Sequence, residues 1–291
     1  MKIAGIDGGG TKTECLIVDT SGEVIGRGLA GPSNLRNQGI KLSAENINLS
    51  LKRAIGRKKI DLDLVFIALA AVEEEYKSEL KKLASLLKVK KVVFGSDQEA
   101  AFRAGTDDDG ILVIAGTGSV VRGWRNGKSF KAGGWGYLAD EGSAFWVGVR
   151  GYQAIAKSLD FSYKGRLGTE FKNMIELNRW IYKDPMVRIP QLSIVIDKAA
   201  DEKNKDALAI LEEGAKELAD RVELVTKRLG FKKEFPLVVS GGMFKSKKFD
   251  RFFKREIKKR TPFAKFIVPK NPPVFGAVKI AIGKTDERRD I

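Results

Sequence analysis

Two short segments combine glycine with hydroxyl and lysine side chains in a way that suits phosphate chemistry. Residues Asp7–Thr13 read DGGGTKT, and residues Gly116–Ser119 read GTGS. Glycine lets the backbone approach an anion closely and turn its N–H groups toward it. The hydroxyls of Thr11 and Thr13 add donors, and Lys12 adds a cation. An ordinary tight hairpin is the alternative, but three successive glycines exceed what a turn requires.

Few types of side chain in this chain are available for acid–base chemistry. There is no histidine and a single cysteine, Cys15. A Ser-His-Asp triad, a His-based zinc site and a four-cysteine cluster within one chain are therefore excluded. Proton transfer must use Asp, Glu, Lys or Tyr. Asp97 is a candidate because it follows a predicted strand and opens a predicted helix; from spacing alone, a catalytic base and a helix N-cap are both open.

A second carboxylate, Asp7, ends the predicted strand that leads into the first glycine turn. Mg²⁺ prefers one or two carboxylates together with phosphates and waters. Asp7 is therefore placed to hold Mg²⁺ through water.

The strands that must position these turns occur twice in the chain. The first set is Lys2–Ile6, Cys15–Asp19 and Val24–Leu29, and the second is Ile111–Ala115, Val120–Arg125 and Ser129–Ala132. In each set a glycine turn follows the first strand, and helices alternating with apolar strands follow the third. The pattern predicts an α/β fold of two duplicated domains with mixed sheets flanking a central cleft. Two equivalent glycine turns facing one cleft could clamp a triphosphate.

The domain boundary is predicted at the polar turn cluster Thr106–Gly110. This gives a smaller N-terminal domain, residues 1–106, and a larger domain, residues 107–272, with a helical insertion. A final helix, about residues 273–291, is opened by two prolines and is expected to pack back on the smaller domain.

The net charge of +16 raises the question of a nucleic-acid partner. The densest basic stretch, Lys245–Arg260, carries four apolar residues at helical spacing: Phe249, Phe252, Phe253 and Ile257. An apolar stripe on a charged helix favours packing on a core over a nucleic-acid patch. We therefore expect no nucleic-acid partner, although the basic charge would attract anionic substrates such as nucleotides.

Several other classes of protein are disfavoured. No apolar run is long enough for a membrane helix and the N-terminus opens directly into a strand, so neither a membrane partner nor a signal peptide is expected. The single cysteine fits a reducing cytoplasm. A Walker A motif would need glycine where Val278 stands, and a dinucleotide fingerprint would need glycine or alanine in place of Val121.

Six segments, in order, then resemble one known family: IDGGGTKT, FGSDQEAAFRAG, IAGTGS, GGWGYLADEGSAFWVG, VVSGGMF and PPVFGAVKIA. They are similar to the N-acetylglucosamine kinase and BadF/BadG-type ATPase family, within the actin-like, hexokinase-like ATPase superfamily, and close to archaeal ATP-dependent hexokinases. The resemblance covers nearly the whole chain, with residues 152–232 matching only in helical character. It implies two ribonuclease H-like domains, and GTGS with DEGSAFW points to the sugar-kinase branch.

The resemblance also implies roles for individual residues. ATP would be bound by Gly9, Gly10, Thr11, Lys12, Thr13, Gly116, Thr117 and Gly118, and by the adenosine loop Gly241, Gly242 and Met243. Asp97 would be the catalytic base, and Asp7 the metal ligand.

For the sugar, the implied ligands are Asn34, Glu73, Asp97, Ser119 and Asp140. Glu73 stands where related hexokinases tend to carry Asp, which leaves the shape of the sugar pocket open. Glu141 is a weaker candidate. Trp135 would either pack on the sugar or fill the cleft wall.

The implied function is an ATP- and Mg²⁺-dependent kinase acting on the 6-hydroxyl of a hexose or hexosamine of the glucose, glucosamine or N-acetylglucosamine type. One alternative is a BadF-type ATPase activator of another enzyme, but such activators need cluster cysteines and Cys15 lies within the first hairpin. Another is a non-catalytic regulator that binds sugar or nucleotide, which the loss of Asp7 or Asp97 would favour; both residues are present. The identity of the sugar and the choice between monomer and homodimer stay open.

Overall fold

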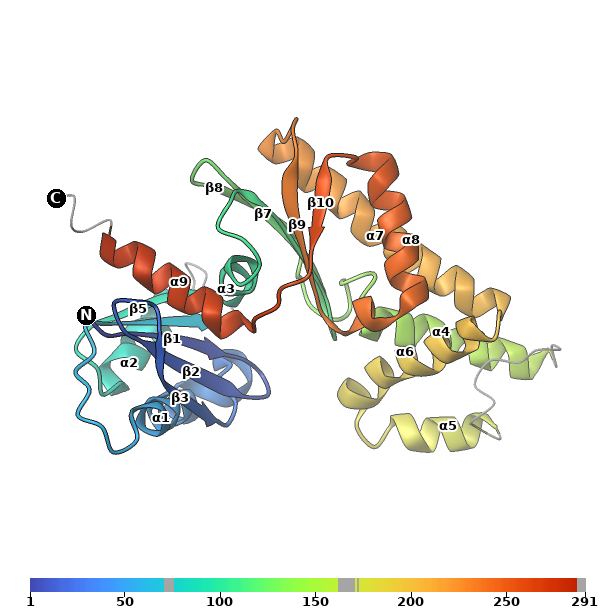
Figure 1. Cartoon of the computed structure of the whole chain (residues 1–291). Helices are drawn as coiled ribbons and strands as arrows, with labels where there is room; N and C mark the ends of the chain where they lie inside the picture. Colours follow the sequence, from blue (N-terminus) through green and yellow to red (C-terminus); the bar gives the residue numbers. More distant parts are fainter. Residues whose placement is uncertain (71–75, 162–170, 172, 287–291) are drawn as a thin grey trace. The chain divides into compact units, whose positions relative to one another are not determined.

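The computed structural model describes residues 1–70, 76–161, 171 and 173–286. The chain forms two compact units (Figure 1). Unit 1 comprises residues 1–107 and 269–291, and unit 2 comprises residues 108–268. No helix in the described part of the chain is long and apolar enough to cross a membrane.

Unit 1 is built on a five-stranded sheet with the order β3-β2-β1-β4-β5. Its strands are β1 (Ile3–Gly8), β2 (Thr13–Val18), β3 (Val24–Ala30), β4 (Leu64–Leu69) and β5 (Val92–Ser96). β1 runs antiparallel to β2 and parallel to β4, and β4 runs parallel to β5. The strand ends that carry Gly8, Leu69 and Ser96 therefore lie at one edge of the sheet, which we call the loop edge of unit 1.

Two pairs of helices cover the faces of this sheet. α1 (Leu35–Ile55) and α2 (Lys77–Leu86) pack on one face, and α3 (Asp97–Arg103) and α9 (Pro273–Asp286) pack on the other. α3 and α9 cross with their backbones in contact, because a Cβ at Gly276 would lie 1.8 Å from the Ala100 carbonyl oxygen. Only glycine permits that approach. The C-terminal helix is thus part of unit 1.

Unit 2 repeats the same topology. Its sheet has the order β10-β9-β6-β7-β8. Its strands are β6 (Gly110–Ala115), β7 (Ser119–Arg125), β8 (Lys128–Gly133), β9 (Phe235–Ser240) and β10 (Ala264–Ile267). As in unit 1, the first strand is central, with two antiparallel strands on one side and two parallel strands on the other. The predicted duplicated α/β fold with mixed sheets is confirmed.

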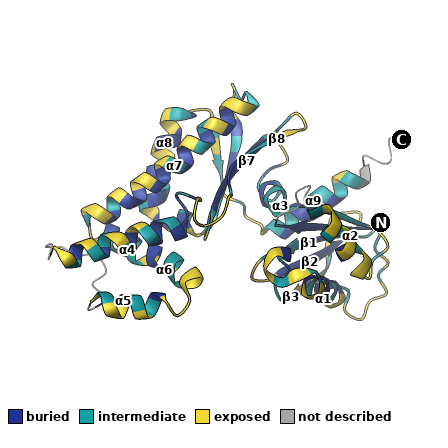
Figure 2. Ribbon diagram, turned by 180° about the vertical axis from the view of Figure 1, so that it is seen from behind, coloured by how far each residue is buried: buried dark blue, intermediate teal, exposed yellow. Residues whose placement is uncertain are grey.

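The helices of unit 2 lie between β8 and β10 in the chain. They are α4 (Ala144–Asp160), α5 (Met174–Ile181), α6 (Pro185–Asp201), α7 (Lys205–Leu229), the short 3₁₀ helix η2 (Gly242–Lys245) and α8 (Lys247–Arg260). α7 packs on β7 and β8, and α8 packs on α7. Figure 2 shows buried and exposed residues alternating along both helices, so each helix has one buried side and one exposed side.

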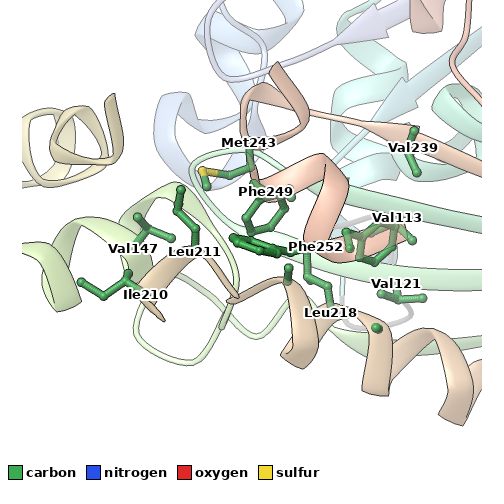
Figure 3. Packing of buried hydrophobic residues seen from close by; sticks show 14 of the residues in the cluster. Val113, Val121, Val147, Ile210, Leu211, Leu218, Val239, Met243, Phe249 and Phe252 are labelled. Carbon is green, nitrogen blue, oxygen red and sulfur yellow. The ribbon is translucent and has the colours of Figure 1, made fainter. Parts of the chain in front are cut away.

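The basic helix predicted near residue 250 is α8, and its apolar stripe is buried. Phe249, Phe252, Phe253 and Ile257 are each at most 7% exposed, and Figure 3 shows Phe249 and Phe252 among core residues of α7 and the sheet. Two basic residues of α8 also pair with acidic residues of α7, Arg255 with Glu212 and Arg260 with Asp220. The helix is held by both apolar packing and ion pairs.

Helix α1 begins at Leu35, directly after its N-cap. Asn34 caps it by accepting a hydrogen bond from the Arg36 N–H at 3.0 Å. Gly39 then adopts φ 72° and ψ 171°, which kinks the helix after its first turn. A left-handed φ is readily adopted by glycine, so the glycine in this polar stretch bends the helix rather than delaying its start.

Candidate active site

The first glycine turn joins β1 to β2 at the loop edge of unit 1. The Gly9 N–H donates to the Lys12 carbonyl oxygen at 3.0 Å, and the Gly9 carbonyl oxygen accepts from the Ser33 N–H at 3.1 Å. The N–H groups of Gly10 and Thr11 have no hydrogen-bond partner among the described residues. A pair of adjacent unpaired N–H groups at a turn can bind an anion.

Gly10 itself is not required by the fold. A Cβ at this position would meet no atom within 4 Å, and the backbone does not have a positive φ. By contrast, a Cβ at Gly8 would lie 2.4 Å from the Leu69 side chain. Gly8 is therefore explained by packing, whereas Gly10 leaves open space above the turn, as a closely approaching ligand would need.

The side chains of the first turn differ in their availability. Thr11 is exposed. Thr13 is fully buried, and its hydroxyl donates to the Gly31 carbonyl oxygen at 2.7 Å and lies 2.8 Å from the Ser33 hydroxyl. Thr13 therefore fixes the loop that follows β3. Lys12 pairs with the carboxylate of Glu14 at 2.7 Å.

Asp7 is the last side chain of β1 before the turn, and its environment favours the protonated form. Burial raises the pKa of Asp7 from 3.8 to about 6; the negative charges of Asp97 and Glu14 add to the rise, and Lys12 opposes it. A carboxylate that is desolvated beside other carboxylates would be stabilised by a cation. No cluster of three or more Asp, Glu, His or Cys among the described residues could hold a metal by itself.

Asp97 is the first residue of α3, at the end of β5. The preceding residue, Ser96, is the N-cap, and its hydroxyl oxygen accepts from the Gln98 N–H at 3.2 Å. The interpretation of Asp97 as the N-cap is therefore wrong: Ser and Asp cap helices about equally well, and the helix begins one residue earlier than that interpretation required. Asp97 also lies close enough to Asp7 to raise its pKa. The loop edge of unit 1 thus brings these two carboxylates together.

Asn34 lies at the same edge, in the loop after β3. This loop is tied to the first glycine turn by the Ser33 N–H and by Thr13. The Asn34 side-chain oxygen caps α1, while its amide NH₂ keeps two further donors. Glu73, the other predicted sugar ligand from this part of the chain, lies outside the described residues.

The second glycine turn joins β6 to β7 in unit 2 and rests on the start of α4. The carbonyl oxygens of Gly116 and Thr117 accept from the N–H groups of Ala144 and Phe145 at 2.8 and 3.3 Å. A Cβ at Gly116 would meet nothing within 4 Å. The Thr117 and Gly118 N–H groups have no hydrogen-bond partner in the part of the chain that the structure describes. The turn thus offers the same pair of donors as the first one.

The predicted adenosine loop follows β9, the parallel neighbour of β6. Gly241 has φ 109°, and a Cβ there would lie 2.3 Å from the Ala115 carbonyl oxygen. Only glycine fits, and the contact places this loop against the strand that leads into Gly116. A Cβ at Gly242 would meet nothing within 4 Å. Met243 is 4% exposed and its side chain lies in the core (Figure 3), so the loop offers mainly backbone.

Two predicted sugar ligands in unit 2 are buried and hydrogen-bonded within the unit. Asp140 is 5% exposed, and its carboxylate accepts from the N–H groups of Trp135, Gly136 and Ser119 at 2.9, 3.3 and 3.3 Å. Ser119 is 3% exposed and its hydroxyl donates to the Glu141 carbonyl oxygen at 2.7 Å. These two side chains join the second glycine turn to the loop before α4.

That loop carries the exposed aromatic residue Trp135. Its side chain is 76% exposed, and the Lys131 ammonium lies 5.0 Å from its ring centroid. Glu141, at the end of the loop, pairs with Arg221 of α7. The loop is therefore fixed at Asp140 and Glu141, while Trp135 faces solvent in unit 2.

Two residues that support these loops were not predicted. Glu14 is 1% exposed and binds both Lys12 and Arg27. Burial alone would raise the pKa of Glu14. Hydrogen bonds from these two cations nevertheless hold that pKa below its usual range. Its signal in the sequence is a charged residue in an otherwise apolar strand. Arg221 had no such signal, because its partner Glu141 is 80 residues away.

Cys15 bears on the activator alternative. It lies on β2 and is fully buried, and burial raises the pKa of its thiol to about 12. A buried, protonated thiol is unsuited to cluster ligation, which needs an accessible thiolate.

Comparisons with known proteins agree on a family. The model of the BadF/BadG/BcrA/BcrD ATPase family matches residues 4–281. The chain is 29% identical to an N-acetylmuramic acid/N-acetylglucosamine kinase of Clostridium acetobutylicum, with 98% of this chain and 99% of the relative covered. It is 28% identical to an N-acetyl-D-glucosamine kinase of Dictyostelium discoideum, with 96% and 97% covered.

A solved structure from Chromobacterium violaceum, whose protein has a provisional N-acetylglucosamine kinase assignment, has the same fold. Its TM-score is 0.75 at 21% identity, with 96% of this chain and 98% of that chain covered.

Proposed function

Since the chain belongs to the BadF/BadG/BcrA/BcrD ATPase family, we propose that it is an ATP-dependent kinase that phosphorylates the 6-hydroxyl of a hexose or hexosamine. The full-length similarity to N-acetylglucosamine kinases supports an N-acetylated hexosamine as the substrate. The single observation that carries the proposal is the loop edge of unit 1, where Asp7 and Asp97 interact electrostatically beside the unpaired N–H groups of a glycine turn.

In the proposed reaction Asp97 is the general base. The 6-hydroxyl oxygen of the sugar attacks the γ-phosphorus of ATP, the bond from that phosphorus to the β–γ bridging oxygen breaks, and ADP leaves. The hydroxyl proton passes to the Asp97 carboxylate. Because Ser96 caps α3, the Asp97 carboxylate does not serve as the cap. Asn34 would orient a sugar hydroxyl through its amide.

Mg²⁺ fits the loop edge of unit 1, because Asp7 supplies one desolvated carboxylate and the described residues offer no complete protein cage. Mg²⁺ is usually held in this way, by one or two carboxylates with phosphates and waters. Asp7 would hold the ion through water. When bound, the ion would neutralise charge on the transferred phosphoryl group.

Unit 2 would bind the nucleotide mainly through its backbone. The N–H groups of Thr117 and Gly118 would donate to phosphate oxygens, as would those of Gly10 and Thr11 in unit 1. The segment Gly241–Met243 would contact the adenosine through main-chain atoms, since Met243 itself is buried. Ser119 and Asp140 would act on the sugar by shaping the loop that carries Trp135, because their own polar atoms are already hydrogen-bonded.

Two further predictions from the sequence belong to the proposal. The lone cysteine supports a reducing, cytoplasmic location. A homodimer stays an open alternative to a monomer.

A panel of sugars tests the proposed function. ADP release would be measured with glucose, glucosamine, N-acetylglucosamine, mannose and N-acetylmuramic acid, each against a control without sugar. We expect at least one sugar to raise ADP release well above that control, with a sugar 6-phosphate as the product. If no sugar does so while ATP is still hydrolysed, the activator alternative gains support. If ATP binds but is not turned over, the alternative of a non-catalytic regulator gains support.

A further inference from the structure

Arg36 lies directly beside a predicted sugar ligand. Asn34 accepts the Arg36 N–H at 3.0 Å, and the kink at Gly39 separates this first turn of α1 from the rest of the helix. The turn follows β3, whose last residue, Ala30, is paired with Thr13 at the loop edge of unit 1. Arg36 therefore belongs to the same edge as Asp7 and Asn34.

The guanidinium of Arg36 is held in one orientation by Tyr76. Its Nε–H donates to the Tyr76 hydroxyl at 3.0 Å, and its central carbon lies 5.3 Å from the centroid of the Tyr76 ring. Tyr76 immediately precedes α2, so two elements of unit 1 fix the side chain. A guanidinium fixed in advance loses little conformational freedom when it binds a further group.

The outer part of this guanidinium has no partner in the part of the chain that the structure describes. In the described residues neither Nη1 nor Nη2 of Arg36 makes a hydrogen bond or an ion pair, and the residue is exposed. The other cations near this edge differ, because both Lys12 and Arg27 are ion-paired with Glu14. Arg36 thus presents an oriented pair of charged N–H donors that no carboxylate of the described residues pairs with.

A carboxylate is the group that this arrangement fits. Two parallel N–H donors of a guanidinium match the two oxygens of a carboxylate, and such charge-assisted pairs are about twice as strong as neutral hydrogen bonds. A neutral sugar hydroxyl would use only part of this capacity. Resting on the proposed function, we propose that Arg36 is a specificity-determining residue that binds a carboxylate-bearing substituent of the sugar, so that acidic hexosamines are substrates.

The test compares two N-acetylated sugars that differ by a carboxylate. N-acetylmuramic acid carries a carboxylate on its lactyl group, and N-acetylglucosamine lacks that group. In Arg36→Met we expect kcat/KM for N-acetylmuramic acid to fall by about 10- to 100-fold, the loss expected for a hydrogen-bonded charge pair. For N-acetylglucosamine we expect a change within about threefold. Equilibrium binding of each sugar, measured calorimetrically without nucleotide, should follow the same pattern.

Two variants serve as controls. Arg53→Met removes an exposed arginine from the far end of α1, where its guanidinium donates to the Leu29 carbonyl oxygen, and should leave the preference between the two sugars unchanged. Tyr76→Phe keeps the ring and removes the hydroxyl that orients Arg36, so it should weaken the acidic sugar selectively but less than Arg36→Met.

Two results would overturn the inference. One is a wild-type protein that binds and phosphorylates N-acetylglucosamine but not N-acetylmuramic acid. The other is an Arg36→Met variant that loses both sugars equally, which would make Arg36 a structural tie between α1 and α2. If the wild-type protein phosphorylates neither these sugars nor any other in the panel, the proposed function itself fails, and that outcome is distinct from both.

Discussion

The sheets of units 1 and 2 have the same strand order, and in each a glycine turn follows the first strand. The ends of the two sheets that carry these turns, the loop edges of units 1 and 2, use their side chains differently. In unit 1, the negative charge of Asp97 helps to raise the pKa of Asp7, and Thr11 and Arg36 are exposed. In unit 2, Ser119, Asp140 and Met243 are all at most 5% exposed, and the two polar ones bind atoms of their own unit. Both edges present backbone N–H groups, and the edge of unit 1 adds polar side chains to them.

Under the proposed function, this difference would assign proton transfer and metal binding to unit 1 and backbone binding of phosphate to unit 2. Proton transfer and metal binding need carboxylates whose charge can respond to a ligand, and unit 1 retains them. Binding of a phosphate chain needs only fixed N–H groups, and unit 2 uses its polar side chains to hold those groups still.

The largest effect on catalysis is expected for the unit 1 variant Asp97→Asn. Removing the proposed base should lower the rate of phosphoryl transfer by at least about 10²-fold while leaving sugar binding intact. Single-turnover kinetics with calorimetric binding of the sugar would measure both. The matched control is Ser96→Ala, which removes the cap of α3 and should cost about 1 kcal/mol of stability. A normal transfer rate in Asp97→Asn would remove Asp97 from its role.

Asp140→Asn in unit 2 should instead act on stability. The carboxylate accepts three backbone N–H groups in a buried site, and an amide would turn its own NH₂ toward at least one of them. We expect the free energy of unfolding to fall by about 1.5–3 kcal/mol, as measured by urea denaturation. Asp97→Asn should change stability far less. An Asp140→Asn protein of unchanged stability that no longer binds sugar would show direct ligation instead.

Asp7 should make stability depend on pH in a direction opposite to that of an ordinary surface carboxylate. Its pKa is 3.8 when unfolded and about 6 in the fold. The protonated form therefore favours folding; this contribution is complete below about pH 4 and is lost as pH rises through 6. Asp7→Asn should thus raise stability by about 1–3 kcal/mol at pH 8, and change it little at pH 3. Thermal unfolding at the two pH values would decide.

The Asp7→Asn variant should also change in activity. Asp7→Asn should lose Mg²⁺-dependent turnover while its stability at pH 8 rises, which is the trade-off expected of a strained functional group. In the wild-type protein, kcat/KM for ATP should fall as pH drops below about 6, because Asp7 then takes up a proton in the free enzyme. A variant that was both active and more stable would argue against a metal role.

The smallest effect is expected for glycines that the fold does not need. Gly10→Ala should leave stability within about 0.5 kcal/mol, because the added Cβ meets no atom, and should weaken ATP binding by about tenfold through a lost backbone contact. Gly116→Ala should behave alike in unit 2. Gly241→Ala is the contrast: its Cβ would clash with Ala115 at 2.3 Å, so the protein should be strongly destabilised. Unchanged ATP affinity in both Gly10→Ala and Gly116→Ala would count against the phosphate role.

Local patterns in the sequence were enough to predict much of the fold. The predicted first strands of the two sets, Lys2–Ile6 and Ile111–Ala115, correspond to β1 and β6, because a short apolar run that leads into a glycine turn is typical of a buried strand. The stripe Phe249, Phe252, Phe253 and Ile257 was predicted from helical spacing and is buried as expected. The glycine turns were recognised because glycine is rare in succession unless a turn or a ligand requires it.

The partners of the site residues were beyond such reasoning. Thr13 was predicted as a phosphate ligand, but its hydroxyl meets Gly31 and Ser33 in a loop 18 and 20 residues away. Asp140 binds an N–H 21 residues away. Those contacts depend on how strands are placed side by side, which no local pattern encodes. The interpretation of Asp97 as the N-cap failed for a different reason, since the adjacent Ser96 has a similar capping preference and residue type alone does not rank the two.

The most direct test of the account follows the γ-phosphoryl group of ATP. Protein would be incubated with ATP, Mg²⁺ and N-acetylglucosamine, and the products followed by phosphorus NMR. We predict that a sugar 6-phosphate appears, with one ADP for each sugar phosphorylated. The Asp97→Asn variant should lose this product while still binding the sugar. Inorganic phosphate appearing without any sugar phosphate, at a rate that Asp97→Asn leaves unchanged, would contradict the account.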